Sequence, residues 1–339
     1  MAAEIEKMMY YGAAPWWVPE EAQGGTTVVD GMTAVKLDNP ATAAIAIKAG
    51  GLDWEVNLAP ILVADPACPG LGGVSIKNRR ATVRSDRPLD KGVLGIVSHN
   101  YLPIQNREAF KFFDQIVGEG KAIYHTAGCL KEGVRIWLLA KLPETIEIVP
   151  GDAIEQFLLL TNAHDGTEAA RIRFTPVRVV CQNTLNMALA TQDTIEARVR
   201  HIGGLTWQFK NAAELLGITT KAFGDTALHY RAMAGKQMGV DGAAEYFRAV
   251  VPDNPLAVCH TRTENMRSVL NHLYENGRGN DMAQTRGTLW AAYNAVTEYI
   301  DHVRMGAATP QKRLYGTWFG TGADLRRDAL KEADKLLVG

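Results

Sequence analysis

The sequence is poor in cysteine and has no long hydrophobic run. Its four cysteines, Cys68, Cys129, Cys181 and Cys259, lie far apart and form no CxxC pair. Scattered thiols of this kind are typical of reduced, buried cysteines in a cytosolic protein. No apolar stretch reaches the roughly 18 residues that a membrane-spanning helix needs, and the N-terminus lacks a basic segment followed by an apolar one. We therefore expect a cytoplasmic protein that does not contact a membrane.

An excess of one charge is also lacking. The 339 residues contain 36 lysines and arginines and 37 aspartates and glutamates, which gives a formal net charge of -1. This balance excludes a protein that coats nucleic acid through bulk charge, so nucleic-acid binding would have to come from a local basic surface. The hydrophobic fraction of 47% is that of a globular protein able to bury a core.

The common enzyme motifs are missing as well. There is no GxxxxGK[ST], no GxSxG and no HExxH, and the run Gly70-Leu71-Gly72-Gly73 lacks the spaced third glycine of a dinucleotide-binding loop. The pair Cys259-His260 has no further ligands at the spacing that a zinc site needs. We therefore assign no catalytic residue, no cofactor and no metal ligand.

Periodicity and turn signals divide the chain into three segments. Residues 1–91 predict an N-terminal arm with short strands, residues 92–203 a core of helix, β-meander and helix, and residues 204–339 a helical region. The expected fold class is α+β, with an antiparallel β-meander packed with helices and followed by a mostly helical C-terminal region.

Individual elements follow from the same signals. Apolar residues at helical spacing predict a helix over 106–117, and Gly217 is expected to separate two later helices. Thr175 as N-cap and Pro176 at the first helical position predict a helix over 177–189. Strands are expected at 26–29, 41–47, 121–129, 134–142, 153–161 and 168–174.

Two local stretches are basic. The first covers residues 76–91, where six cations face only Asp86 and Asp90; these cations are Lys77, Arg79, Arg80, Arg84, Arg87 and Lys91. The stretch is either a solvated edge strand with protective charges or a segment that follows a phosphate backbone. The second stretch starts on the strand at 168–174, and its candidate residues are Arg171, Arg173, Arg178, Gln182, Asn183, Arg198 and Arg200. Arginine forks and amide donors together are suited to phosphate groups.

Other chemistry is less well supported. Asn162, His164 and Asp165 cluster in one turn, which is either an ordinary backbone turn or an acid-base or metal site. His125 on a predicted strand is more typical of a core or surface histidine than of a catalyst. The aromatic arm around Trp16 and Trp17 either covers its own domain or clasps a neighbouring subunit.

Three segments carry a family resemblance. The runs YLPIQN at 101–106, FTPVRVVCQNTL at 174–185 and TRGTLWAAYNAVTEY at 285–299 resemble the phage/plasmid-like family of domain of unknown function 932. Members often carry Pro-Trp-His near the N-terminus, where this chain has Pro15-Trp16-Trp17. The resemblance implies a mobile-element origin but no established reaction.

A second resemblance concerns architecture. The order of helix, β-meander and basic helix is similar to the core of ring-forming phage single-strand annealing proteins of the Red beta, RecT and Erf types. It implies an ATP-independent, cytoplasmic DNA-binding protein in a phage-infected or plasmid-bearing bacterium. Its partners would be single-stranded DNA, the complementary strand, further copies in a ring or filament, and a phage exonuclease.

Our leading hypothesis is therefore strand annealing. Arg171, Arg173, Arg178, Gln182 and Asn183 would hold one backbone, with Arg198 and Arg200 nearby. The first stretch would close the groove or hold the second strand through Lys77, Arg79, Arg80 and Arg84. The alternatives are a small-molecule or nucleotide-acting enzyme with His164 and Asp165 beside Arg178, or a non-catalytic phage structural or host-modulating protein.

Overall fold

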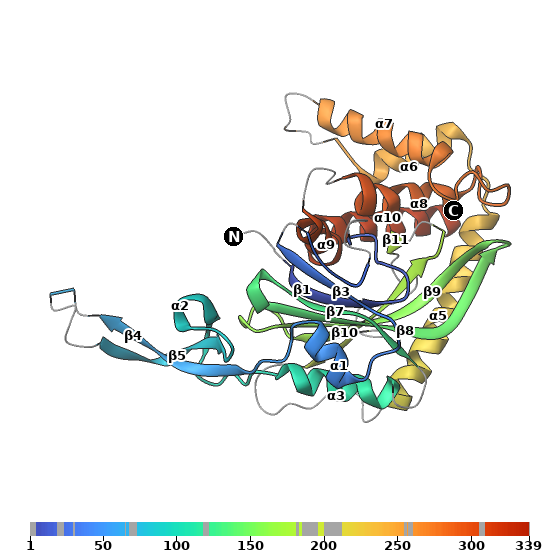
Figure 1. The fold of residues 1–339 in the computed structure, drawn as a ribbon. Helices are drawn as coiled ribbons and strands as arrows, with labels where there is room; N and C mark the ends of the chain where they lie inside the picture. The colour runs from blue at the N-terminus through green and yellow to red at the C-terminus, as the bar shows by residue number, and fades with distance from the viewer. Residues whose placement is uncertain are drawn as a thin grey trace.

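The chain folds into a large mixed sheet, a small projecting sheet and a set of helices (Figure 1). The expected α+β class, with a β-meander followed by a mostly helical C-terminal region, is confirmed. This computed structural model describes residues 5–18, 24–29, 31–64, 66–67, 73–117, 122–180, 183–184, 196–199, 212–253, 256, 260–304 and 309–338.

Within these residues, nine strands form the large sheet. They run in the order β11-β10-β9-β8-β7-β1-β3-β2, and β12 also pairs with β10. The pairs are antiparallel except for β1 with β3. The bounds are β1 Ile5–Tyr11, β2 Thr26–Val29, β3 Met32–Leu37, β7 Ile123–Leu130, β8 Arg135–Val149, β9 Asp152–Ala163, β10 Ala170–Arg178, β11 Asn183–Thr184 and β12 Glu196–Val199.

Both faces of the large sheet are covered, which explains its nearly continuous apolar strands. Leu158 and Leu160 of β9 belong to a core shared with α1 (Ala43–Ala49), α3 (Asn106–Val117) and α5 (Ala212–Gly235). Phe157 and Leu159 point to the opposite face, which is covered by the N-terminal arm and by α9 (Pro310–Phe319). The aromatic arm therefore lies over its own sheet.

The small sheet extends away from the body of the molecule (Figure 1). It consists of β4 (Val56–Ala64), β5 (Gly73–Arg84) and β6 (Val93–Ser98), with the short helix α2 (Leu89–Gly92) before β6. Its base is docked through Gly95, because a Cβ at this position would stand 2.6 Å from the Cα of Asp165. The strands β4 and β5 form an exposed ribbon, which we call the β4–β5 arm; β6 pairs with residues 79–83 of β5, at the inner end of this ribbon.

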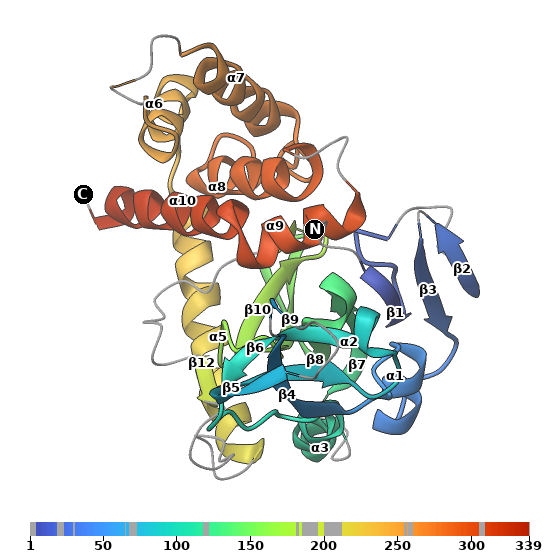
Figure 2. The same cartoon turned by 90° about the vertical axis from the view of Figure 1, so that its left-hand side faces the viewer.

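The remaining helices pack beyond one end of the large sheet (Figure 2). No helix in the described part of the chain is both long and apolar enough to span a membrane. Cys129 is buried, and burial raises the pKa of its thiol to about 12; the other three cysteines lie outside the described residues. The helical bounds are α6 Val240–Val250, α7 Thr261–Asn276, α8 Leu289–Glu298 with its π-helical continuation η3 Tyr299–Val303, and α10 Thr321–Val338.

Two secondary-structure predictions outside the meander are wrong. The strand expected at 41–47 is a helix instead: α1 begins at Ala43, and Thr42 Oγ1 accepts a hydrogen bond from the backbone N–H of Ile45 at 3.4 Å. Alanine favours helices and threonine caps them, so the apolar alternation was misleading. Gly217 was expected to break a helix, but α5 continues through it.

The predicted helix over 177–189 is also wrong at its start. Residues 175–178 continue β10, and Pro176 pairs with Gln156 of β9. Proline has no N–H and is tolerated where a strand has no partner on one side. Pro176 meets this condition because β12 pairs with residues 170–173 and β11 with residues 177–178. Gln182 and residues 185–189 lie outside the described residues.

Candidate functional site

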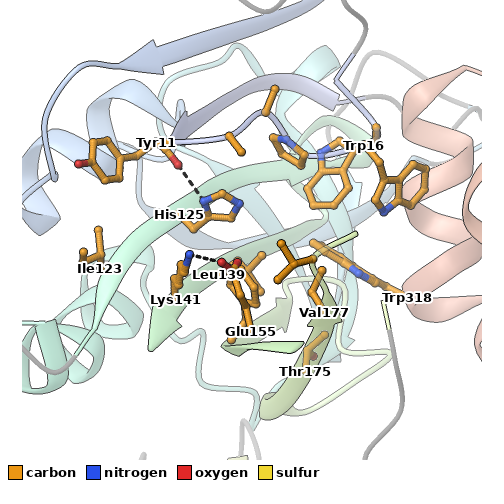
Figure 3. A pocket seen from close by; sticks show the side chains of 17 residues that line it. Tyr11, Trp16, Ile123, His125, Leu139, Lys141, Glu155, Thr175, Val177 and Trp318 are labelled. Carbon is orange, nitrogen blue, oxygen red and sulfur yellow. Dashed lines mark hydrogen bonds and ion pairs between the residues drawn. The ribbon is translucent and has the colours of Figure 1, made fainter. Parts of the chain in front are cut away.

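A cavity of about 310 Å³ lies where the N-terminal arm crosses the large sheet (Figure 3). Its floor is built from the strands β7 to β10, which contribute His125, Lys141, Glu155, Phe157 and Thr175 among others. These positions share one face because directly opposed residues in antiparallel strands point to the same side. The arm, from Tyr11 to Trp17, and Trp318 of α9 form the walls.

The walls are strongly aromatic. Trp17 makes edge-to-face contacts with Trp16 and with Trp318, at centroid separations of 5.5 Å and 5.2 Å. The Phe157 ring lies 5.2 Å from His125. Such surfaces favour flat, apolar ligand faces.

His125 contributes a defined polar group to this cavity. Its Nδ1 lies 2.8 Å from the carbonyl oxygen of Tyr11, which can only accept, so Nδ1 carries the proton. The pKa of His125 is lowered to about 4, mainly by burial and also by the charge of Lys141, which together outweigh the raising effects of the Tyr11 carbonyl and Glu155. The ring is therefore neutral near pH 7, and Nε2 offers a lone pair.

The charges among the cavity residues are paired with each other. Lys141 Nζ donates to Glu155 Oε1 at 2.6 Å, as Figure 3 shows beside His125. Their side chains are 37% and 25% exposed, so this ion pair stands on the solvent side of the cavity. The lining residues that the structure describes thus present no unpaired charge.

Arg171 and Arg173 lie on the same face of the sheet as the cavity floor. In β10 they precede Thr175 by four and two positions, respectively, and Arg173 is opposite Leu159, as Thr175 is opposite Phe157. Both side chains are half-buried. By register, Arg198 of β12 is opposite Arg171, and Asn183 of β11 is opposite Arg178. Arg200 and Gln182 lie outside the described residues.

The cations of the β4–β5 arm are exposed. Lys77, Arg79 and Arg80 all reach solvent, and within the described residues none of them forms an ion pair with a carboxylate. The arm also exposes apolar side chains, namely Leu62, Val63, Val74 and Ile76. Exposed cations beside exposed apolar groups are a surface that is suited to a polyanion.

Arg84, predicted as part of the same surface, belongs to the interior. Its side chain is 3% exposed and binds both carboxylate oxygens of Asp86, at 2.8 and 2.9 Å. It also donates to Glu6 and to the Glu132 carbonyl, and its guanidinium lies 4.4 Å from the Trp54 ring centroid. Its donors are occupied, so we remove Arg84 from the candidate nucleic-acid residues.

Arg178 requires the same correction. It is fully buried and binds Asp152 through Nη2 at 2.6 Å and Nε at 2.8 Å. The carbonyls of Arg278 and Gly279 and the side chain of Asn280 accept its other hydrogen bonds. Arg178 therefore ties the large sheet to the loop after α7 and cannot reach a phosphate chain.

The alternative enzyme site does not assemble. His164 is fully buried, with Nε2 3.1 Å from Asn106 Oδ1 and its ring against Trp54. Asp165 Oδ1 accepts from the N–H and the hydroxyl of Thr167, which is ordinary turn chemistry. Arg178 pairs with Ile154 at the opposite end of β9, roughly 30 Å away by strand geometry. The described residues contain no group of three His, Cys, Asp or Glu placed to hold a metal.

The cavity was missed by the sequence analysis. The arm and His125 were each noted, but they are more than a hundred residues apart, and Trp318 is further still. The one usable signal was the alternation that places His125, Lys141, Glu155 and Phe157 on the face opposite the leucines of the core.

Comparison with known proteins gives a family but no function. The family described as a domain of unknown function, DUF932, matches residues 93–333. No curated protein and no solved structure matches the chain. The matched residues include the strands β7 to β10, which form the cavity floor, and Trp318. The N-terminal arm and the strands β4 and β5 precede the matched residues.

Proposed function

The chain belongs to the family of domain of unknown function 932, and we propose that it binds single-stranded DNA and anneals complementary strands without ATP. The observation that carries this proposal is the β4–β5 arm, on which Lys77, Arg79 and Arg80 are exposed. In a chain with a net charge of -1, an exposed basic strand is a local binding surface of the kind that a near-neutral protein needs.

A second surface supports the proposal. Arg171 and Arg173 lie beside a cavity walled by aromatic rings, and single-strand binding proteins combine such cations with aromatic rings that stack on bases. The β4–β5 arm would hold the backbone of one DNA strand, and the face of the large sheet beside the cavity would hold bases and phosphates of the same or a second strand.

Annealing asks little chemistry of the protein. Base pairing and stacking make the reaction downhill, so the protein has to neutralise phosphates and present extended strands. A mobile-element origin, a ring or filament of several copies, and a phage exonuclease as partner belong to this same proposal. They rest on the family resemblance and on the likeness of the helix and β-meander to annealing proteins, without the basic helix that was expected to follow the meander.

A gel-shift titration with labelled single-stranded DNA tests the proposal at low and at physiological salt. The variant Lys77→Ala/Arg79→Ala/Arg80→Ala should bind at least tenfold more weakly at physiological salt and anneal complementary oligonucleotides more slowly. The matched control, Arg327→Ala/Lys331→Ala/Lys335→Ala, removes three exposed cations from α10 and should bind like the wild type.

Two results would overturn the proposal. Failure of the wild type to bind single-stranded DNA at low salt would end it. Equal losses in the arm variant and in the α10 control would mean that net charge, and not the arm, governs binding.

A further inference from the structure

We propose that the cavity under the N-terminal arm binds a single nucleobase, a planar heterocycle that carries both a hydrogen-bond donor and an acceptor. The base can come from a free nucleoside or from a DNA strand. In the second case the inference rests on the proposed function, and in the first it does not.

The first argument is shape. The cavity volume of about 310 Å³ is at the lower end of the range of small-molecule sites, which run from about 300 to 1,000 Å³. Trp16, Trp17 and Trp318 form its walls and Phe157 its floor. Aromatic side chains stack on bases with about 1–3 kcal/mol per base. The space is thus suited to a flat ring and too small for a folded peptide segment.

The second argument is a hydrogen-bond acceptor in the cavity, Nε2 of His125. His125 uses Nδ1–H on the Tyr11 carbonyl, which leaves Nε2 as an acceptor. Figure 3 shows the ring of His125 between Tyr11 and Trp16, with Nδ1 directed to Tyr11. No residue in the described part of the chain donates a hydrogen bond to Nε2. An N–H or an exocyclic amino group of a base would provide that hydrogen bond.

The third argument is a donor that awaits an acceptor. Trp17 is 4% exposed, and its buried indole N–H has no acceptor among the described residues. A buried donor without a partner costs about 1–3 kcal/mol. A carbonyl oxygen or ring nitrogen on a ligand that reaches this N–H would remove the cost, whereas a hydrocarbon chain would leave His125 Nε2 unpaired.

The charges favour a neutral ligand. Lys141 and Glu155 neutralise each other at 2.6 Å, so the cavity offers no free cation for a phosphate or carboxylate. Arg171 and Arg173 lie outside the lining residues, on the same sheet face. A nucleotide would therefore place its base in the cavity and its phosphate toward these arginines.

The test is ligand-observed NMR with thymidine, cytidine, adenosine and guanosine, and with deoxyribose 5-phosphate as the sugar-phosphate control. At least one nucleoside should bind at millimolar concentration or below, and the sugar phosphate should not. His125→Asn keeps a donor for the Tyr11 carbonyl but lacks Nε2, and Trp17→Phe keeps a ring but lacks the N–H. Each should weaken nucleoside binding about tenfold.

Two controls separate binding from folding. His272→Ala removes an exposed histidine on α7 and should bind nucleosides like the wild type. Circular dichroism and thermal unfolding show whether each variant is folded. Should one cavity variant fail to fold, the other still decides the outcome.

The two proposals fail in different ways. Nucleosides that bind the wild type and the arm variant equally well, while oligonucleotides do not bind, would sink the proposed function and leave a free-nucleoside site. Conversely, three results together would overturn the inference alone. An oligonucleotide would bind no more tightly than one of the same length made of abasic sites, nucleosides would not bind at about 10 mM, and His125→Asn would have no effect.

Discussion

The strands β5 and β10 are equally basic in sequence, yet the structure uses their cations in opposite ways. On β5, Lys77, Arg79 and Arg80 stand on an exposed ribbon. On β10, the strongest sequence candidate, Arg178, is fully buried against Asp152. In both strands the basic run ends in a buried arginine, which is Arg84 in β5 and Arg178 in β10.

This difference shows that a carboxylate partner in the folded protein, and not the local density of cations in the sequence, decides whether an arginine is buried or available to a ligand. Asp152 begins β9 and is brought to Arg178 by the antiparallel pairing of β9 with β10. Asp152 is held in turn by the indole N–H of Trp290 at 2.9 Å. A buried arginine with a carboxylate and three further acceptors contributes to folding, whereas an exposed arginine without a carboxylate is available to a ligand.

The largest effect is expected at the buried pair. Arg178→Ala leaves Asp152 charged and unpaired in the interior, which should lower the free energy of unfolding by about 3–5 kcal/mol. Urea denaturation measures this loss. Arg80→Ala, on the exposed arm, is the matched control and should change stability by less than about 0.5 kcal/mol. Similar values for the two variants would break the comparison.

Arg84 should be intermediate. Its partners Glu6 and Asp86 are 41% and 40% exposed, so water compensates part of what Arg84→Met removes. The expected loss is about 2–3 kcal/mol, because charged hydrogen bonds and the contact with Trp54 are lost. The same denaturation experiment checks it, and a loss above that of Arg178→Ala would contradict the ranking by burial.

The cavity adds a pH dependence. An unfolded histidine has a pKa of about 6.5, and folded His125 has a pKa of about 4, so between these values the unfolded chain binds a proton that the folded chain does not. Stability should therefore fall on acidification, by about 2 kcal/mol at pH 5 from this residue. Tyr11, Lys141, Glu155 and Phe157 face the ring and stay in place in His125→Asn.

The free energy of unfolding of the wild type and of His125→Asn, measured at pH 7 and pH 5, gives the contribution of His125 as a difference between the two proteins. The variant should lose about 2 kcal/mol less between the two pH values. Parallel losses would contradict a lowered pKa for folded His125, because the folded and unfolded chains would then bind the proton alike between pH 7 and pH 5.

Much of the fold follows from local signals. The helix over 106–117 has the predicted bounds, and the meander was predicted from its alternation. The tight connection between β7 and β8 is made by Lys131, Glu132 and Gly133, which all have positive φ values. Pro176 was misread because a proline that starts a helix and a proline at a gap between two partner strands look alike in sequence. Only the pairing of β11 and β12 with β10 separates the two cases.

The site was less accessible to prediction. The cavity joins Tyr11, His125 and Trp318, which only tertiary structure brings together. The role of Arg178 depends on Asp152 and on the loop around Gly279, so neither the strand nor its own neighbours could reveal burial. The exposed cations of β5 were found from the local charge imbalance of residues 76–91, but the same imbalance also selected Arg84, which is buried.

The smallest effect on stability should come from the β4–β5 arm. The variant Lys77→Ala/Arg79→Ala/Arg80→Ala is expected to change the free energy of unfolding by less than about 0.5 kcal/mol per residue. The same variant should have the clearest effect on DNA. Because each phosphate contact on a single strand contributes about 0.7 to the salt dependence, three lost contacts should reduce it by about 2.

Fluorescence anisotropy of a labelled single-stranded oligonucleotide over a series of salt concentrations is therefore the most direct test. It gives the slope of log K against log salt for the wild type, the arm variant and the α10 control. We predict binding at low salt, a slope about 2 smaller in magnitude for the arm variant, and an unchanged slope for the control. Absence of binding, or equal slopes for the wild type and the arm variant, would contradict the account.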